Sequence, residues 1–273
     1  MLAYEGESNA LGFRDRDHAE AKTPGVLRIA VLGDSVAAGL RVARTEDVFP
    51  AQLERALETL GIRAEVLSFA VSGYNTQQEV ETFKAKVRPY RPDLVIVAYC
   101  LNDRSSQDDG AILRRLRTIA AGQGGLGLAS HPLLNKSALY RFLGSRLSRT
   151  ELSPDQVLGD TVEDSLKELS QLSEAGGFEV LVVVFPAIVF PRPYLARAEH
   201  EWIRKVALAN DLRFFDLLKP FKECAESGRK LGMDTFHPSP EGHRCAGEAT
   251  ARFLKDALPN WRRAANTPRA PSP

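Results

Sequence analysis

Short apolar segments alternate with longer amphipathic segments along this 273-residue chain, and this alternation constrains the fold more than any other feature. Residues 27–32 form a mostly apolar run with β-branched side chains that ends at Gly33, as expected for a buried strand. Residues 49–60 repeat apolar positions at helical spacing, and Gly61 then ends the predicted helix. The alternation continues with predicted strands at 64–71, 93–99, 178–185 and 212–216, and with predicted helices at 77–87, 161–175, 195–210 and 240–258.

Strands that alternate with helices of this length imply a parallel sheet covered on both faces. The sequence therefore predicts an α/β protein, a three-layer α/β/α sandwich with a parallel sheet of about five strands.

The same pattern predicts one domain over residues 26–258, preceded by an N-terminal lead-in at 1–25. The pattern lapses over about 104–160, where we expect an insertion that forms a lid or substrate wall, or else a surface excursion. Residues 259–273 contain four prolines and three arginines, which predicts a disordered tail.

Composition limits the classes of partner. Lysine and arginine total 36 against 35 acidic residues, so the net charge of +1 favours neither nucleic acid nor an anionic membrane. No apolar run reaches the roughly 18 residues of a membrane span, which argues against stable membrane insertion. Residues 1–25 lack the layout of a signal peptide, so a cytoplasmic location is the default, and secretion is expected if the true start lies upstream of Met1. The sequence carries no signal for an oligomeric state.

The cysteines are few and irregularly spaced. Cys100, Cys224 and Cys245 form neither a CxxC pair nor a metal-ligand pattern. An odd number without such spacing argues against a disulfide framework and against a zinc site. We therefore expect three free thiols, buried or partly buried.

Polar residues that carry chemistry stand where predicted strands end. Ser35 follows the first strand after a Gly-Asp turn, Gly73 follows the second, Asn102 follows the third, and Asp234 and His237 follow the last. In a parallel α/β sheet, ligands bind beyond the carboxyl ends of the strands, where the loops converge and the helices begin with free backbone N–H groups. We therefore expect these residues to form one site.

The residue types at this edge are those of nucleophilic catalysis. A serine hydroxyl is a poor nucleophile at neutral pH and needs a base, for which His237 is the candidate. Asp234, three residues earlier on a tight turn, is predicted to fix the tautomer of His237 and to stabilise its imidazolium. Ser239 and Pro240 predict a capped start for the closing helix, which anchors this pair. The backbone N–H groups of Ser35 and Gly73 and the side-chain amide of Asn102 are the predicted oxyanion donors.

At these residues the chain resembles the SGNH hydrolases, also called GDSL esterases and lipases. The blocks at 31–35, 72–75, 100–103 and 234–238 stand in the order of the serine, glycine, asparagine and histidine blocks of that family. The resemblance spans about residues 26–258, and residues 9–15 also look like the lead-in of some bacterial members. It implies a flavodoxin-like fold without a cofactor, and hydrolysis or transfer of an ester-linked acyl group. One departure is Cys100, which replaces the glycine of the third block and can tilt Asn102 or narrow the pocket.

The sequence thus predicts a serine esterase or lipase-type hydrolase with Ser35, Asp234 and His237 as its triad, acting on a small-molecule, lipid or carbohydrate ester. No cofactor and no metal are expected. Two alternatives stay open, an O-acyltransferase that uses the same triad and a non-catalytic binding protein on an SGNH-like scaffold. Ser35 as a plain helix cap, and a metal site at Asp234, His237 and His243, are weaker interpretations of the same residues.

Overall fold

The computed structural model describes residues 8–101, 103, 159–191 and 193–257, and the structural statements below concern these residues. The predicted insertion at 104–160 lies outside them except for its last two residues. Asn102 and the predicted tail at 259–273 lie outside them as well.

Five parallel strands form a single sheet in the order β2-β1-β3-β4-β5. This is the strand order of flavodoxin-like folds, in which the direction of winding reverses beside the first strand. Alternating strands and helices therefore produce the predicted parallel sheet. The strands are β1 (Leu27–Gly33), β2 (Ala64–Ala70), β3 (Leu94–Tyr99), β4 (Glu179–Val184) and β5 (Arg213–Asp216).

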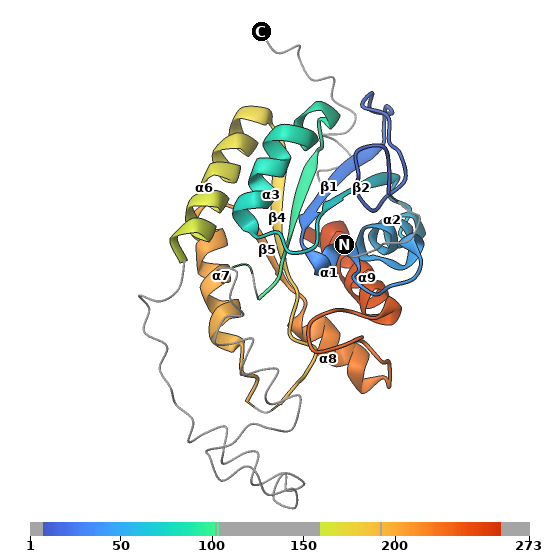
Figure 1. The fold of residues 1–273 in the computed structure, drawn as a ribbon, viewed down its shortest axis with the longest axis vertical. Coiled ribbons are helices and arrows are strands. Elements are labelled where there is room, and N and C mark those ends of the chain that lie inside the picture. The colour runs from blue at the N-terminus through green and yellow to red at the C-terminus, as the bar shows by residue number, and fades with distance from the viewer. Residues whose placement is uncertain (1–7, 102, 104–158, 192, 258–273) are drawn as a thin grey trace, which may run out of the picture.

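Helices cover both faces of the sheet, which confirms the predicted three-layer α/β/α sandwich (Figure 1). Side chains from the two faces of each strand enter separate apolar clusters: Val31 packs in the cluster of Leu53, whereas Leu32 packs in the cluster of Leu166. One face is covered by α1 (Ser35–Ala38), α2 (Phe49–Thr59), α8 (Leu218–Glu226) and α9 (Pro240–Ala257), and the other by α3 (Thr76–Thr82), α6 (Gly159–Gly176) and α7 (Arg197–Ala209).

Two features of these layers differ from the prediction. Neither α1 nor α8 is predicted, and the helix predicted at 77–87 ends as an α-helix at Thr82 and continues as a π-helical turn, Phe83–Val87. Two further connections contain short 3-10 turns, at Thr45–Asp47 and Arg88–Tyr90. In the described part of the chain, no helix is long and apolar enough to cross a membrane.

The contact between α2 and α9 is unusually close at Gly247. A Cβ atom at this position would lie 2.7 Å from the backbone carbon of Gln52, well inside van der Waals distance. The missing side chain therefore lets the two helix backbones approach each other. This packing fixes α9, which begins three residues after His237.

The cysteines require a correction. Cys224 of α8 and Cys245 of α9 form a disulfide, with Cα atoms 6.6 Å apart, while Cys100 is buried and takes no part in a disulfide. The expectation of three free thiols is therefore wrong, because pairing depends on two helices that pack together, which the spacing of the cysteines does not reveal. The bridge closes a ring of chain that contains both Asp234 and His237.

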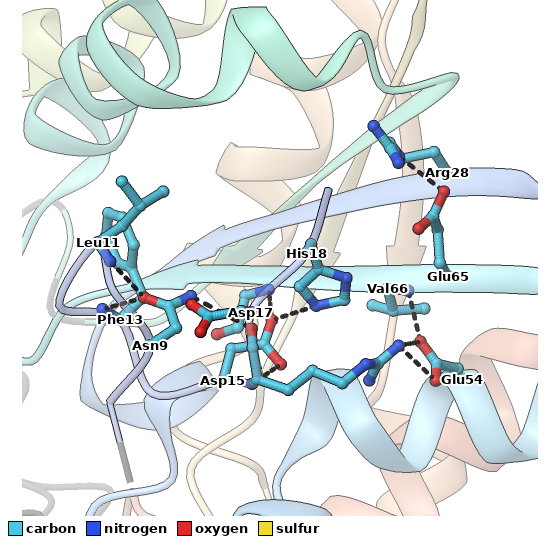
Figure 2. Close-up of polar contacts among 12 residues, drawn as sticks. Asn9, Leu11, Phe13, Asp15, Asp17, His18, Arg28, Glu54, Glu65 and Val66 are labelled. Atoms are coloured by element: carbon cyan, nitrogen blue, oxygen red, sulfur yellow. Dashed lines mark hydrogen bonds and ion pairs between the residues drawn. The ribbon is translucent and has the colours of Figure 1, made fainter. Parts of the chain in front are cut away.

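Residues 9–17, here called the N-terminal arm, lie along the outer edge of the sheet (Figure 2). Asp15 Oδ2 accepts the N–H of Ser68 at 2.7 Å, and Glu54 Oε2 accepts the N–H of Val66 at 2.7 Å. These two carboxylates take the place of a neighbouring strand on β2. Because an edge strand with unpaired N–H groups invites association, this arrangement protects the edge.

Candidate active site

The nucleophile candidate and the base candidate meet at the carboxyl edge of the sheet although 202 residues separate them in the sequence. Ser35 Oγ lies 3.0 Å from His237 Nε2. On the other side of the ring, His237 Nδ1 lies 2.8 Å from Asp234 Oδ2 and 3.0 Å from Oδ1. The fold thus brings Ser35, His237 and Asp234 together in one hydrogen-bonded chain.

A tight turn presents Ser35. The buried Asp34 carboxylate caps α1 by accepting the Val36 N–H at 2.8 Å, so Ser35 is the first residue of this helix. Gly33 makes the turn possible, because a Cβ atom there would lie 2.7 Å from the Cβ atom of Ala37. The Gly-Asp-Ser sequence therefore sets the serine at the point where β1 turns sharply into α1.

Backbone hydrogen bonds hold Asp234 as an anion. Burial raises the pKa of its carboxyl, but the N–H groups of His237 and Phe236, each 2.9 Å from Oδ1, and the imidazole ring outweigh this and hold the pKa below its ordinary value. An ionised Asp234 accepts a hydrogen bond from the N–H at Nδ1 of His237, which leaves Nε2 without a proton and able to accept from the hydroxyl of Ser35. This tautomer is the one that general-base chemistry needs.

The start of α9 anchors the same turn. Ser239 caps the helix as predicted, since its hydroxyl accepts the Gly242 N–H at 3.2 Å and its carbonyl accepts the His243 N–H at 2.9 Å. Just before it, the Met233 N–H donates to the carbonyl of His237 at 2.8 Å. The turn that carries Asp234 and His237 is therefore fixed by backbone hydrogen bonds before it, at Met233, and after it, at Ser239.

The structure describes two of the three predicted oxyanion donors, Ser35 and Gly73. Gly73 lies in the turn between β2 and α3 with a φ of 85°, a conformation that favours glycine. Asn102 lies outside the described residues, so its role stays a prediction. Its neighbour Asp103 is buried and accepts the Cys100 N–H at 3.3 Å and the Thr76 hydroxyl at 3.4 Å. These bonds tie the loop after β3 to the start of α3.

Arg41 is part of this site, and sequence analysis missed it. Its Nη1 donates to Asp234 Oδ2 at 3.1 Å, and its side chain is 60% exposed. Arg41 has a φ of 67°, which is uncommon for a residue with a side chain. No sequence pattern marks a single surface arginine as the partner of a carboxylate 193 residues away.

The metal interpretation of the His237 region finds no supporting geometry. In the parts of the chain that the structure describes, no group of three or more histidine, cysteine or acidic side chains is arranged to hold a metal ion. His243 is fully buried, and desolvation, with further contributions from Arg14 and His237, lowers its pKa to about 3.

Comparison with known proteins assigns the chain to a family. A family model of GDSL-like lipases and acylhydrolases matches residues 31–245. The chain belongs to this family. The match includes the Gly-Asp-Ser turn at Ser35 and the Asp234–His237 turn, so the resemblance read from four short blocks is confirmed. A search of curated proteins finds no match to the chain.

Solved structures agree with the fold of this GDSL-family chain. A two-domain esterase active on acetylated mannans superposes with a TM-score of 0.52 at 14% identity, covering 91% of this chain and 53% of the esterase, so the chain spans about half of that protein. The acetyl xylan esterase AlAXEase gives 0.52 at 18% identity over 85% of this chain and 100% of its own. The esterase EstA from Pseudoalteromonas sp. gives 0.52 at 14% identity over 85% and 99%. At these identities the likeness concerns the fold alone.

Three buried carboxyl groups lie behind the site of this GDSL-family chain: Asp34, Glu79 and Asp103. Burial raises the pKa of Glu79 and of Asp103 well above their ordinary values, and repulsion within the group adds to this. Neither carboxylate oxygen of Glu79 has a hydrogen-bond partner among the described residues. The sequence did contain a signal, because Glu79 falls on the buried stripe of α3 with Thr76 and Val80.

Proposed function

We propose that this protein is a serine carboxylic ester hydrolase that works through an acyl-enzyme on Ser35. The observation that carries the proposal is the continuous chain from Ser35 Oγ through the His237 ring to the Asp234 carboxylate, with contacts of 3.0 and 2.8 Å. Membership of the GDSL-like lipase/acylhydrolase family supports ester hydrolysis in general.

The geometry supports a two-step mechanism. Ser35 Oγ attacks the ester carbonyl while its proton passes to His237 Nε2, and the Asp234 carboxylate stabilises the resulting imidazolium. The tetrahedral oxyanion accepts hydrogen bonds from the proposed donors, the N–H groups of Ser35 and Gly73 and the amide of Asn102. Collapse breaks the ester C–O bond, and His237 returns the proton to the leaving alcohol. Water then attacks the acyl-enzyme by the same steps, which releases the acid and restores Ser35.

The substrate class is proposed as small-molecule, lipid or carbohydrate esters. Two of the structural neighbours are named for esterase activity on acetylated polysaccharides, the mannan esterase and the acetyl xylan esterase. An acetyl group on a carbohydrate hydroxyl is therefore a rational first substrate, and an O-acyltransferase with the same triad remains the alternative.

Hydrolysis of p-nitrophenyl esters, from acetate to octanoate, tests this proposal. We expect the wild type to turn over at least one ester, and Ser35→Ala to lose about 10⁴-fold or more in kcat. Ser173→Ala, which removes a hydroxyl from α6 on the opposite face of the sheet, serves as the matched control and should keep wild-type activity. Equal turnover by Ser35→Ala would refute the acyl-enzyme. A wild type that is inactive until an acceptor alcohol is added would replace hydrolysis with acyl transfer.

A further inference from the structure

We infer that Arg14, on the N-terminal arm, is a positioning residue that holds both the nucleophile Ser35 and the carboxylate Asp234 in their reactive geometry. The inference rests on the proposed function of these two residues. It extends the active site to a segment that lies before the first strand and outside the span of the family match.

The arm is a fixed part of the fold. Asn9 Oδ1 accepts the N–H groups of Leu11 at 3.1 Å and Phe13 at 3.0 Å, which folds the start of the arm into a turn (Figure 2). The ring of Phe13 packs edge-on against Phe69 of β2, with ring centroids 5.1 Å apart. Arg14 therefore leaves the arm at a position that both hydrogen bonds and apolar packing determine.

The guanidinium of Arg14 is buried against the end of α1. Its Nη1 donates to the carbonyls of Gly39 at 2.7 Å and Ala38 at 3.3 Å, and its Nη2 donates to the carbonyl of Val42 at 2.7 Å. Its Nε lies 3.4 Å from the hydroxyl of Thr45. Arg14 is only 5% exposed, so these bonds are shielded from water.

Two of these acceptors stand at the carboxyl end of the helix that carries the nucleophile, since Ala38 is the last residue of α1 and Gly39 is its C-cap. Helix α1 has four residues and begins at Ser35, whose carbonyl accepts the N–H groups of Gly39 and Leu40. A helix of one turn is not stable by itself, because nucleation is unfavourable and few bonds follow it. A cation that binds the carbonyls at the carboxyl end of α1 holds this short helix in place and interacts favourably with the helix dipole.

The same guanidinium supports the carboxylate of the site. Gly39 and Val42, which it binds, flank Arg41, whose backbone has the uncommon φ of 67° and whose side chain donates to Asp234. A strained residue persists only where its surroundings determine it, and such residues cluster at functional sites. Arg14 thus reaches Ser35 through α1 and reaches Asp234 through the Arg41 loop.

The planar fork of arginine is essential to this role. It binds three carbonyls that are spread over residues 38–42, whereas a lysine ammonium is a compact point charge on a flexible stem. Arg14→Lys keeps the charge but loses the fixed geometry. A displacement of about 1 Å between reacting groups can reduce the rate about 100-fold.

The test compares Arg14→Lys and Arg14→Ala with Arg16→Lys, a matched change on the same arm at a side chain that binds Glu54 instead of α1. For the Arg14 variants we expect kcat to fall about 100-fold, with KM within about twofold of wild type, because substrate binding is not altered. Added guanidinium should restore part of the activity of Arg14→Ala. The control should keep wild-type kcat, and circular dichroism should report folded protein throughout.

A folded Arg14→Lys variant with wild-type kcat would overturn the inference, and so would a fall in kcat that guanidinium does not relieve in folded Arg14→Ala. If both variants fail to fold, Arg41→Gln decides, since its side chain is exposed. We expect this variant to lose about 10-fold in kcat with KM unchanged. An unchanged kcat would refute the inferred connection from Arg14 through Arg41 to Asp234. Reaction of wild type with a fluorophosphonate separates the two proposals: a wild type that does not react refutes the nucleophile itself, whereas equal reaction rates for wild type and Arg14→Lys refute only the role of Arg14.

Discussion

Asp234 is the residue that determines which nitrogen of His237 carries the proton. Its carboxylate is acceptor-only when ionised, and the lowered pKa keeps it ionised through the neutral range. An asparagine at this position offers an N–H to Nδ1, which moves the ring proton to Nε2 and leaves Ser35 without a base. For Asp234→Asn we therefore expect kcat to fall about 10⁴-fold while the fold is retained, measured by ester turnover and thermal unfolding. A loss of less than tenfold in a folded variant would contradict this assignment.

Glu79 should make the stability of the protein depend on pH. Its folded pKa is raised, so between the unfolded value of about 4.3 and the folded value the native state holds a proton that the unfolded state has released. The contribution of Glu79 to the free energy of unfolding is therefore largest at a pH below this range. It decreases as the pH rises through the range, by at most about 1.4 kcal/mol per pH unit. Glu79→Gln removes the titration and preserves the shape.

Urea unfolding between pH 5 and pH 8 measures this effect. We expect the free energy of unfolding to fall less steeply with rising pH for Glu79→Gln than for wild type. Glu81→Gln on the same helix is the control, since the side chain of Glu81 is 62% exposed and lies against Lys84. Identical slopes for wild type and Glu79→Gln would show that Glu79 is ionised in the folded protein.

At the scale of elements, α8 and α9 act as a bridged pair around the Asp234–His237 turn. Linking residues 21 positions apart restricts the unfolded chain and is expected to stabilise the protein by about 3 kcal/mol. Denaturant unfolding with and without a reductant should show this loss for wild type. The double variant Cys224→Ala/Cys245→Ala should start from the lower stability and should not respond to the reductant. A wild type that is indifferent to reduction would mean that the bridge does not form in solution.

The sequence predicts those elements in which apolar residues repeat at strand or helix spacing. All five strands and the long amphipathic helices are found because their apolar spacing repeats over enough residues to be read. Helix α1 has too few residues to show a period, and α8 carries Pro220 in its first turn, which disguises the helix. The disulfide is missed for a related reason, because its formation depends on how α8 packs against α9, and the sequence of either helix alone does not predict this packing.

At the scale of the whole molecule, the proposed site draws on residues from the N-terminal arm to the turn before α9. The topology of a parallel sheet made part of this predictable, because residues that follow successive strands must meet at one edge. The sequence predicts in this way that Ser35, Asp234 and His237 meet, and the structure brings these three residues together. Arg14 and Arg41 reach their partners through tertiary contacts that no local sequence pattern indicates, so their places beside the proposed site could not be predicted.

The central claim is a covalent acyl group on Ser35, and trapping it during turnover tests the claim most directly. Wild-type protein mixed with p-nitrophenyl acetate is quenched with acid before the ester is consumed, digested, and analysed by mass spectrometry. We predict a mass increase of one acetyl group on the peptide that contains Ser35, and no such increase in Ser35→Ala. An acetyl group on another residue that disappears as turnover ends, with Ser35 unmodified throughout, would contradict the account.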